Sequence, residues 1–244
     1  RECLRFALEN GVDAVSQSFV EGAADLRAVR DAARQLGHDF FLIAKIERSR
    51  ALERLDEILD VSDGLMVARG DLGVEVPIER IAVVQKEIIR RANQRAKPVI
   101  TATQMLESMI NNPTPTRAEA SDVANAIFDG TDAVMLSGET AAGKYPIETV
   151  EMMRKIIIDA ESKEMFFNFD DWAILDKNRT KFGMSVAKAA TSLAKETGAK
   201  AFCAYSHTGK AAIRLTAQRP RIPVYVFSSS IESVRRMNLV RGAF

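Results

Sequence analysis

Four short blocks of charged, hydroxyl and glycine residues each end an apolar run and begin a helical pattern. They are residues 45–47 (KIE), 68–71 (ARGD), 101–104 (TATQ) and 135–140 (MLSGET). Polar residues at the C-terminal ends of successive strands are the usual location of chemistry in an α/β barrel. The blocks supply a cation, carboxylates, hydroxyls and glycines, a combination that suits the binding of a metal ion and a phosphorylated acid.

Glu47 and Asp71 end two consecutive predicted strands. Neighbouring strands lie about 4.8 Å apart, so carboxylates at equivalent heights can share one hard cation. Mg²⁺ takes one or two protein carboxylates and completes its octahedron with substrate oxygens and water. Each acid taken alone is as well explained by a solvated surface position, but their shared placement favours a metal site.

Lys45 lies two residues before Glu47, so both side chains point to the same face of the strand. A lysine inside an apolar run needs a partner or a task. Its partner is either one of the two carboxylates or the phosphate of a ligand, and both alternatives stay open.

The turn at Arg69, Gly70 and Asp71 begins a helix, where free N–H groups and the helix dipole suit a carboxylate or phosphate. Gly70 would let a ligand approach the backbone closely. Arg69 is either catalytic or part of a structural ion pair. Thr103 and Ser137 end later strands, and each hydroxyl either contacts a bound acid, relays a proton or only packs.

A loop further along, with Ser206, Thr208, Gly209 and Lys210, follows a strand and precedes a helix. It is a possible phosphate cradle, although so short a signature is not specific.

The elements that position these residues alternate between strand and helix, which predicts a parallel sheet buried on both faces. Five β-α units do not close a barrel of eight strands. We expect a partial barrel domain at 1–160, a connector at 161–179 and a partial α/β domain at 180–244. The predicted strands are 14–19, 40–46, 64–68, 98–102, 133–136, 201–205 and 224–227, and the predicted helices 24–36, 52–59, 81–92, 118–128, 184–195, 211–217 and one that begins at Pro146.

The composition is that of an ordinary globular chain, with 47% hydrophobic and 27% charged residues and a net charge of +1. Nothing indicates a nucleic-acid partner, a membrane span or a secretory signal, so we expect a cytoplasmic protein. Cys3 and Cys203 are expected to be buried, reduced thiols.

Long runs of this sequence closely resemble the pyruvate kinase family. They are AKIE at 44–47, DGLMVARGDLG at 63–73, ITATQMLESM at 100–109, PTRAEASDVANA at 115–126 and DAVMLSGET at 132–140. Residues 180–241 are similar to the family's C-terminal domain more loosely. The resemblance implies an α/β fold: strands 4–8 of a (β/α)₈ TIM barrel, followed by part of an α/β C-terminal domain.

The resemblance also implies an activity, the glycolytic transfer of a phosphoryl group from phosphoenolpyruvate to ADP, giving pyruvate and ATP. By resemblance, Glu47 and Asp71 carry Mg²⁺ or Mn²⁺, and Lys45 stabilises the moving phosphoryl group. Gly70, Asp71 and the Thr103 hydroxyl hold the substrate carboxylate, and Ser137 belongs to the network that protonates the enolate. The family further implies K⁺, with ligands outside this chain, and a homotetramer.

Several features depart from the family pattern. The chain begins at Arg1 without Met, ends in a strand-like run at 239–244, and lacks the family's first three barrel strands and lid, so we expect an inactive piece of a larger enzyme. The loop at 206–210 replaces the family's Ser-Gly-Arg-Thr pattern, which argues against sugar-phosphate regulation. The alternatives are a Mg²⁺-dependent barrel lyase acting on pyruvate or its enolate, and a non-catalytic regulatory remnant.

Overall fold

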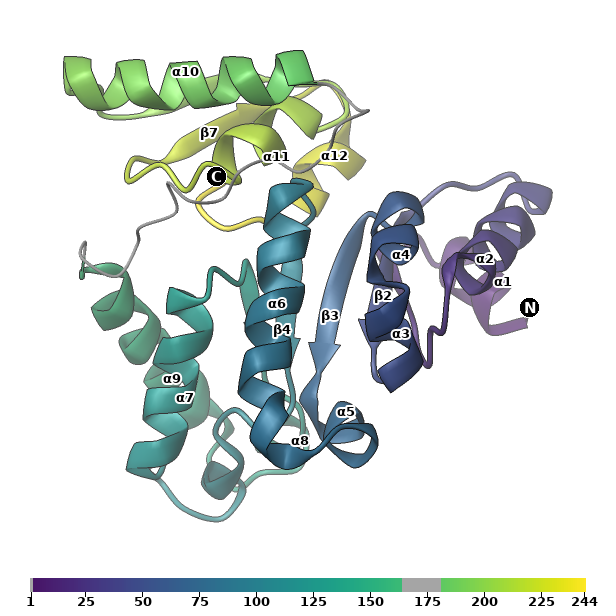
Figure 1. Ribbon diagram of the computed structural model, residues 1–244, viewed down its shortest axis with the longest axis vertical. Helices are drawn as coiled ribbons and strands as arrows, with labels where there is room; N and C mark the ends of the chain where they lie inside the picture. Colours follow the sequence, from purple (N-terminus) through teal and green to yellow (C-terminus); the bar gives the residue numbers. More distant parts are fainter. Residues whose placement is uncertain (1, 164–180) are drawn as a thin grey trace.

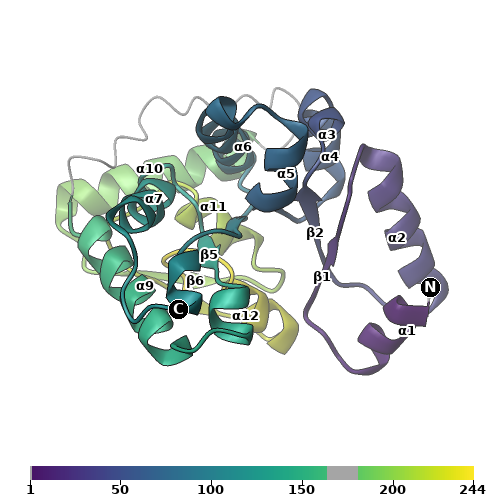
Figure 2. The same cartoon turned by 90° about the horizontal axis from the view of Figure 1, so that it is seen from below.

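The computed structural model describes residues 2–163 and 181–244. Five parallel strands form one sheet in the order β1-β2-β3-β4-β5, each strand beside its successor in sequence (Figures 1 and 2). The strands are β1 (Ala14–Gln17), β2 (Phe41–Ile46), β3 (Gly64–Ala68), β4 (Val99–Ala102) and β5 (Ala133–Met135). This order is that of consecutive βα units in a barrel wall.

Helices connect the strands and cover the outer face of the sheet (Figure 2). The longer ones are α1 (Glu2–Glu9), α2 (Ala23–Gln35), α6 (Ile81–Gln94), α7 (Arg117–Phe128) and α9 (Pro146–Glu161). The shorter ones are α3 (Ser49–Glu53), α4 (Leu55–Val61), α5 (Arg69–Glu75), η1 (Ile78–Arg80), η2 (Glu107–Ile110) and α8 (Gly138–Ala141).

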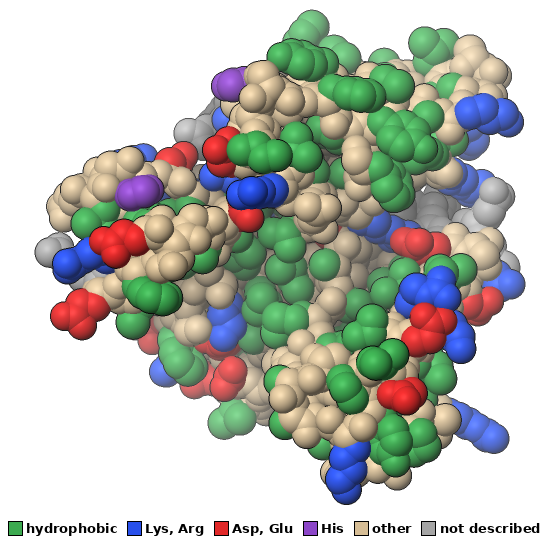
Figure 3. Space-filling model, turned by 180° about the vertical axis from the view of Figure 1, so that it is seen from behind, with side chains coloured by type: hydrophobic (Ala, Val, Ile, Leu, Met, Phe, Trp, Pro, Cys, Tyr) green, Lys and Arg blue, Asp and Glu red, His purple; other side chains and the backbone are tan. Residues whose placement is uncertain are grey.

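The two faces of the sheet have separate apolar clusters because successive side chains on a strand point to opposite faces. On β2, Leu42, Ala44 and Ile46 pack with the helices in the largest core cluster. Phe41 and Ile43 belong instead to a cluster on the inner face, together with Met66 and Ile100. Figure 3 shows apolar side chains in a hollow between the lobes of the molecule on the side opposite to the view of Figure 1.

A second unit follows in the chain and contains α10 (Lys181–Thr197), β6 (Phe202–Tyr205), α11 (Lys210–Thr216), β7 (Val224–Phe227) and α12 (Ile231–Met237). The strands β6 and β7 are parallel, and Ala243 forms an isolated bridge to Val224 beside them. This unit lies at the end of the large sheet where the strands begin, whereas α5 and α8 lie at the opposite end (Figure 1). The sheet therefore has one end covered by protein and one end bearing the polar blocks.

The predicted α/β fold with a parallel sheet is confirmed, and the seven predicted strands all form with bounds shifted by at most a few residues. The stripe at 52–59 is two helices, α3 and α4, because the chain leaves helical geometry at Arg54 (φ −110°, ψ 20°). The short strand-like run at 239–244 forms only the isolated bridge at Ala243.

The expected burial of both cysteines is wrong: Cys3 and Cys203 are exposed free thiols in short amphipathic elements. The predicted connector falls almost entirely outside the described residues. Across the described ranges, no helix has the length and apolar character needed to cross a membrane.

Candidate functional site at the C-terminal end of the sheet

Lys45 and Glu47 lie on the inner face of the sheet, where alternation along β2 places them in line with Phe41 and Ile43. Lys45 Nζ is 2.5 Å from Glu47 Oε1, and it also donates a hydrogen bond of 3.1 Å to Ser18 Oγ. The Glu47 side chain is 1% exposed and that of Lys45 is 23% exposed. The predicted cation and one predicted carboxylate are therefore brought together as a largely desolvated ion pair.

The second oxygen of Glu47 is held by the backbone. The Phe19 N–H, which belongs to a residue with φ +54°, donates to Glu47 Oε2 at 2.6 Å. Glu47 Oε1 is buried and has no hydrogen bond of acceptable geometry, although the Lys45 ammonium lies beside it. A carboxylate supplies the hard oxygen ligands that Mg²⁺ takes from proteins. The donor chemistry of Glu47 thus fits Mg²⁺.

Asp71 lies in the first turn of α5 and is exposed. The register of β2 and β3 pairs Ile46 with Val67, so Glu47 and the start of α5 leave the same end of the sheet. The described residues contain no group of three His, Cys, Asp or Glu arranged to hold a metal. Mg²⁺ does not require such a group, since one or two protein carboxylates suffice. That Glu47 and Asp71 share one ion stays a prediction.

Gly70 and Thr103 contact each other directly. The Gly70 N–H donates to Thr103 Oγ1 at 2.8 Å, and the Thr103 hydroxyl donates to the Ala102 carbonyl at 2.6 Å. The Thr103 hydroxyl oxygen therefore accepts a hydrogen bond from the N–H group that is predicted to bind a ligand carboxylate.

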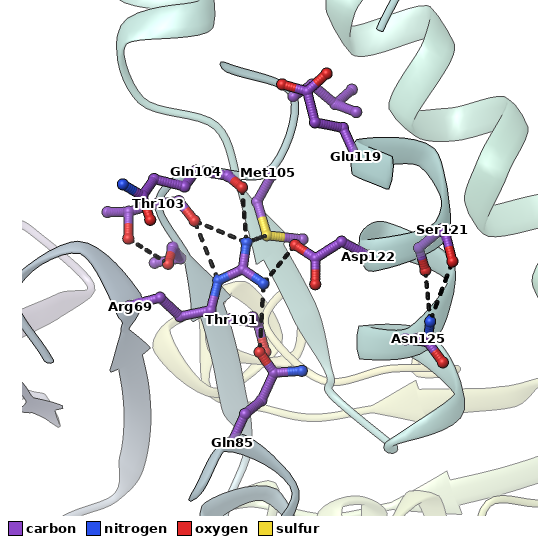
Figure 4. A network of polar contacts seen from close by, with 12 residues as sticks. Arg69, Gln85, Thr101, Thr103, Gln104, Met105, Glu119, Ser121, Asp122 and Asn125 are labelled. Atoms are coloured by element: carbon purple, nitrogen blue, oxygen red, sulfur yellow. Dashed lines mark hydrogen bonds and ion pairs between the residues drawn. The ribbon is translucent and has the colours of Figure 1, made fainter. Parts of the chain in front are cut away.

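Arg69 is a buried structural residue with a 7% exposed side chain, which decides the alternative that the sequence leaves open (Figure 4). Its guanidinium donates to the carbonyls of Thr103 and Gln104 and forms an ion pair of 2.6 Å with Asp122. It also contacts Gln85 Oε1 at 3.4 Å. Arg69 therefore ties the end of β3 to the loop after β4 and to α7.

Ser137 follows β5 at the same end of the sheet and is partly buried. Its N–H donates to Glu139 Oε2 at 2.7 Å, while Glu139 Oε1 accepts from the Leu106 N–H at 3.2 Å. Glu139 is 2% exposed. This buried acid binds the Ser137 backbone N–H and not its hydroxyl. The predicted proton relay therefore stays a prediction.

The loop at 206–210 lies at the opposite end of the molecule. Ser206 Oγ accepts from the Ala211 N–H at 3.4 Å, and Gly209 has φ +74°. His207, Thr208 and Lys210 line a cleft of about 850 Å³ between the second unit and the residues that precede β2, β3 and β4. The predicted site residues thus form two separate groups, one at each end of the large sheet.

The cleft carries an excess of positive charge. Six of its lining residues are Lys or Arg and three are Asp, namely Arg30, Arg95, Lys97, Lys210, Arg214 and Arg236 against Asp39, Asp60 and Asp63. Burial, together with the charges of Arg30 and Lys210, lowers the pKa of Lys97 against the opposing effect of Asp63 and Asp60. Two buried atoms of lining residues, Gln94 Oε1 and Arg236 Nε, have no hydrogen-bond partner.

Comparison with known families agrees with this architecture. The family profile described as "Pyruvate kinase, barrel domain" matches residues 1–150, and the profile "Pyruvate kinase, alpha/beta domain" matches residues 184–244. This chain belongs to the pyruvate kinase family. Both matches fall on the two units that the structure contains.

Curated pyruvate kinases from distant organisms are similar over nearly the whole chain. It is 46% identical to pyruvate kinase PKLR of Homo sapiens, aligned over 99% of this chain and 42% of that protein. It is 44% identical to the pyruvate kinase of Leishmania mexicana (98% and 48%) and 47% identical to that of Agrobacterium vitis (99% and 49%). The chain therefore spans somewhat less than half the length of these relatives.

Sequence reasoning predicted the charged residues that the structure brings together at this end of the sheet but missed the groups that hold them. Residue type and strand position indicated Lys45 and Glu47. The Phe19 N–H on Glu47 and the Leu106 N–H on Glu139 join residues 28 and 33 positions apart and have no local signal. The capping pattern that begins at Thr116 was the one local signal of this kind, since Thr116 and Glu119 form a capping box.

Proposed function

We propose that this protein contributes the phosphoryl-transfer site of a pyruvate kinase, which moves a phosphoryl group from phosphoenolpyruvate to ADP. The observation that carries the proposal is the buried Lys45–Glu47 pair at the same sheet end as Gly70 and Thr103. Phosphoryl transfer depends mainly on positioning and charge neutralisation. A desolvated cation beside a metal-suited carboxylate supports that chemistry.

Each residue has a proposed task. Lys45 neutralises negative charge on the transferring phosphoryl group, where a fixed cation in a dry site is most effective. Glu47 and Asp71 would hold Mg²⁺ or Mn²⁺, which supplies Lewis-acid neutralisation of phosphoryl oxygens when bound. The N–H groups at Gly70 and Asp71 and the Thr103 hydroxyl bind the substrate carboxylate. Ser137 lies in the path that delivers a proton to the enolate carbon.

The remaining expectations from the family extend the proposal. We propose a homotetramer in the cytoplasm, with K⁺ bound by residues outside these 244 positions. We also propose that the 244-residue chain alone shows no turnover. The described part supplies five barrel strands, so its sheet has two open edges and an apolar inner face. Such a sheet positions a substrate poorly and invites non-native pairing.

A regulatory anion site in the cleft is the second proposal. Six cationic side chains facing three acidic ones support the binding of a small phosphorylated molecule, with Thr208 and Lys210 from the predicted loop and Lys97 from the barrel unit. Ser206 and Gly209 shape the loop and do not line the cleft. The ligand class is set by charge, and the departure from the family loop pattern argues against assuming the family's sugar phosphate.

The main proposal is tested with Lys45→Met in the full-length enzyme, with Lys155→Met as the matched control because that lysine is 64% exposed on α9. We expect Lys45→Met to lower kcat for phosphoenolpyruvate and ADP by about 10²-fold or more, with little change in KM, because the charge acts on the transition state. The control should match the parent enzyme.

A loss of less than about threefold in kcat would contradict the role of Lys45. Turnover of pyruvate or its enolate by the parent protein, without transfer to ADP, would favour the barrel lyase. Strong ligand binding in the cleft by a full-length protein with no turnover of either kind would favour the regulatory remnant.

A further inference from the structure

The guanidinium of Arg69 makes three hydrogen bonds to the backbone carbonyls of one short turn. Nη2 donates to the Thr103 and Gln104 carbonyls, both at 2.9 Å, and Nε donates to the Thr103 carbonyl at 3.2 Å. Nη1 pairs with Asp122 at 2.6 Å. Because arginine presents its N–H groups in one rigid plane, these contacts fix the two carbonyls relative to the end of β3.

The turn that Arg69 holds has an unfavourable backbone. Thr103 has φ +69° and Gln104 has φ +54°, so two consecutive residues with side chains adopt the left-handed conformation. That conformation is disfavoured for every residue except glycine, and most of all for a β-branched one such as threonine. Such strain persists only where the surrounding structure determines it, and it concentrates at functional sites.

The strained turn positions one functional group, the Thr103 hydroxyl. Thr103 Oγ1 lies 2.8 Å from the Gly70 nitrogen, and Gly70 is the next residue after Arg69. The first turn of α5 therefore holds Thr103 at two points, the carbonyl through the Arg69 side chain and the hydroxyl through the Gly70 N–H. A glycine at position 103 would relieve the strain and lose the hydroxyl.

We propose that Arg69 is a positioning residue, which holds the Thr103–Gln104 turn in its left-handed form and so places the Thr103 hydroxyl at the substrate carboxylate. That the group bound by this hydroxyl is a substrate carboxylate rests on the proposed function. The placement of the hydroxyl against the Gly70 N–H does not. Arg69 itself stays buried behind the turn, with further contacts to Gln85 Oε1 and Met105 Sδ.

Arg69→Lys in the full-length protein tests the proposal, because lysine keeps the charge and cannot bridge two carbonyls in a plane. We expect kcat for phosphoenolpyruvate to fall by about 10- to 100-fold, the effect of misplacing a positioned group. In a Thr103→Val background, the same change should cost less than about twofold. Arg219→Lys, at another buried arginine with a 4% exposed side chain, is the matched control and should leave kcat unchanged.

A second readout does not depend on catalysis. Loosening the turn should remove the acceptor of the Gly70 N–H, so hydrogen exchange at Gly70 should become at least tenfold faster in Arg69→Lys and stay unchanged in Arg219→Lys. Asp122→Asn is a milder variant that loosens the guanidinium from the α7 side, and it should shift both readouts in the same direction by a smaller factor.

Unchanged exchange at Gly70 in a folded Arg69→Lys protein would overturn the proposal. Equal losses of kcat in the Thr103 and Thr103→Val backgrounds would also overturn it, since Arg69 would then act without the hydroxyl. If Arg69→Lys does not fold, Asp122→Asn decides by the same two readouts. Faster exchange at Gly70 in Arg69→Lys, in a protein whose parent shows no phosphoenolpyruvate turnover, would support the placement and reject the proposed function instead.

Discussion

The two ends of the large sheet differ in how their charged side chains are paired. At the C-terminal end, Lys45 pairs with Glu47 and Arg69 pairs with Asp122, so the polar groups partner one another before any ligand arrives. At the N-terminal end, the cleft collects six cationic residues against three acidic ones. The first arrangement favours fixed geometry. In the second, Arg30 pairs with Asp63 and Arg95 pairs with Asp56, but the lining residues still include more cations than acids, which favours an anion.

The N-terminal end also contains the most buried junction between the two units. Asp132 and Arg219 form an ion pair of 2.8 Å with side chains that are 5% and 4% exposed. Asp132 additionally accepts from the N–H groups of Val99 and Arg241, at 3.0 Å and 3.3 Å. At this end the Asp132 carboxylate therefore joins the two units, while the residues that line the cleft beside it include more cations than acids.

The largest effect should come from Asp132→Ala, which would leave Arg219 buried and unpaired. Removing one partner of a buried pair costs about 3–5 kcal/mol, and we expect that loss in the free energy of unfolding measured in urea. Asp31→Ala is the control, because Asp31 and Arg34 form a surface pair with side chains that are 62% and 73% exposed. A loss below about 1 kcal/mol, the level of a surface pair, would contradict the view that the Asp132–Arg219 pair stabilises this end of the sheet.

A middle-sized effect is expected in the cleft. Lys97→Met and Lys210→Met should each weaken the binding of inorganic phosphate, followed by calorimetry, by about tenfold, the worth of one charge-assisted hydrogen bond. Phosphate affinity should fall as the pH rises through the pKa of Lys97, at a lower pH than for an ordinary lysine, because burial lowers that pKa. Lys155→Met is the control. Equal affinity in all variants would show that the cleft charges hold no anion.

The smallest effect belongs to Glu119, which ties η2 to the start of α7 at the C-terminal end. Ser108 N and Oγ donate to its carboxylate at 2.7 Å and 2.5 Å, and Thr116 N donates at 2.7 Å. Burial would raise the pKa of Glu119, but these hydrogen bonds outweigh it and lower the pKa from its usual 4.5.

Glu119→Gln should therefore cost about 0.5–1.5 kcal/mol of unfolding free energy at neutral pH. A carboxyl with a lowered pKa stabilises the fold above its unfolded pKa and loses that contribution as the pH falls through the folded value. The difference between parent and variant should accordingly shrink in acid. If the difference in unfolding free energy between parent and variant stays constant from neutral pH down to acid, the hydrogen bonds of Glu119 do not depend on its charge.

Local patterns were sufficient to predict most of the fold and the shared strand face of the two charged residues on β2. The run from Gly64 to Ala68 has apolar residues that are all buried, and the alternation along β2 puts Lys45 and Glu47 on one face. The contacts of Arg69 with Thr103, Gln104 and Asp122 join positions 34 to 53 residues apart and depend on the packing of the strands beside one another. No periodicity encodes them, and the left-handed turn at Thr103 lacks the glycine that would have signalled it.

The Asp132 carboxylate has a consequence for the order in which the chain folds. Its bond to the Val99 N–H spans 33 residues, whereas its partner Arg219 follows 87 residues later. On a growing chain, the strands β4 and β5 are therefore complete while the acid between them still lacks its cation, and a buried acid without a cation is unfavourable. At synthesis rates of about 5–20 residues per second, that interval lasts several seconds. The second unit thus supplies the cation for an acid in the preceding sheet, and a pause or cleavage before Arg219 would leave that acid without its partner.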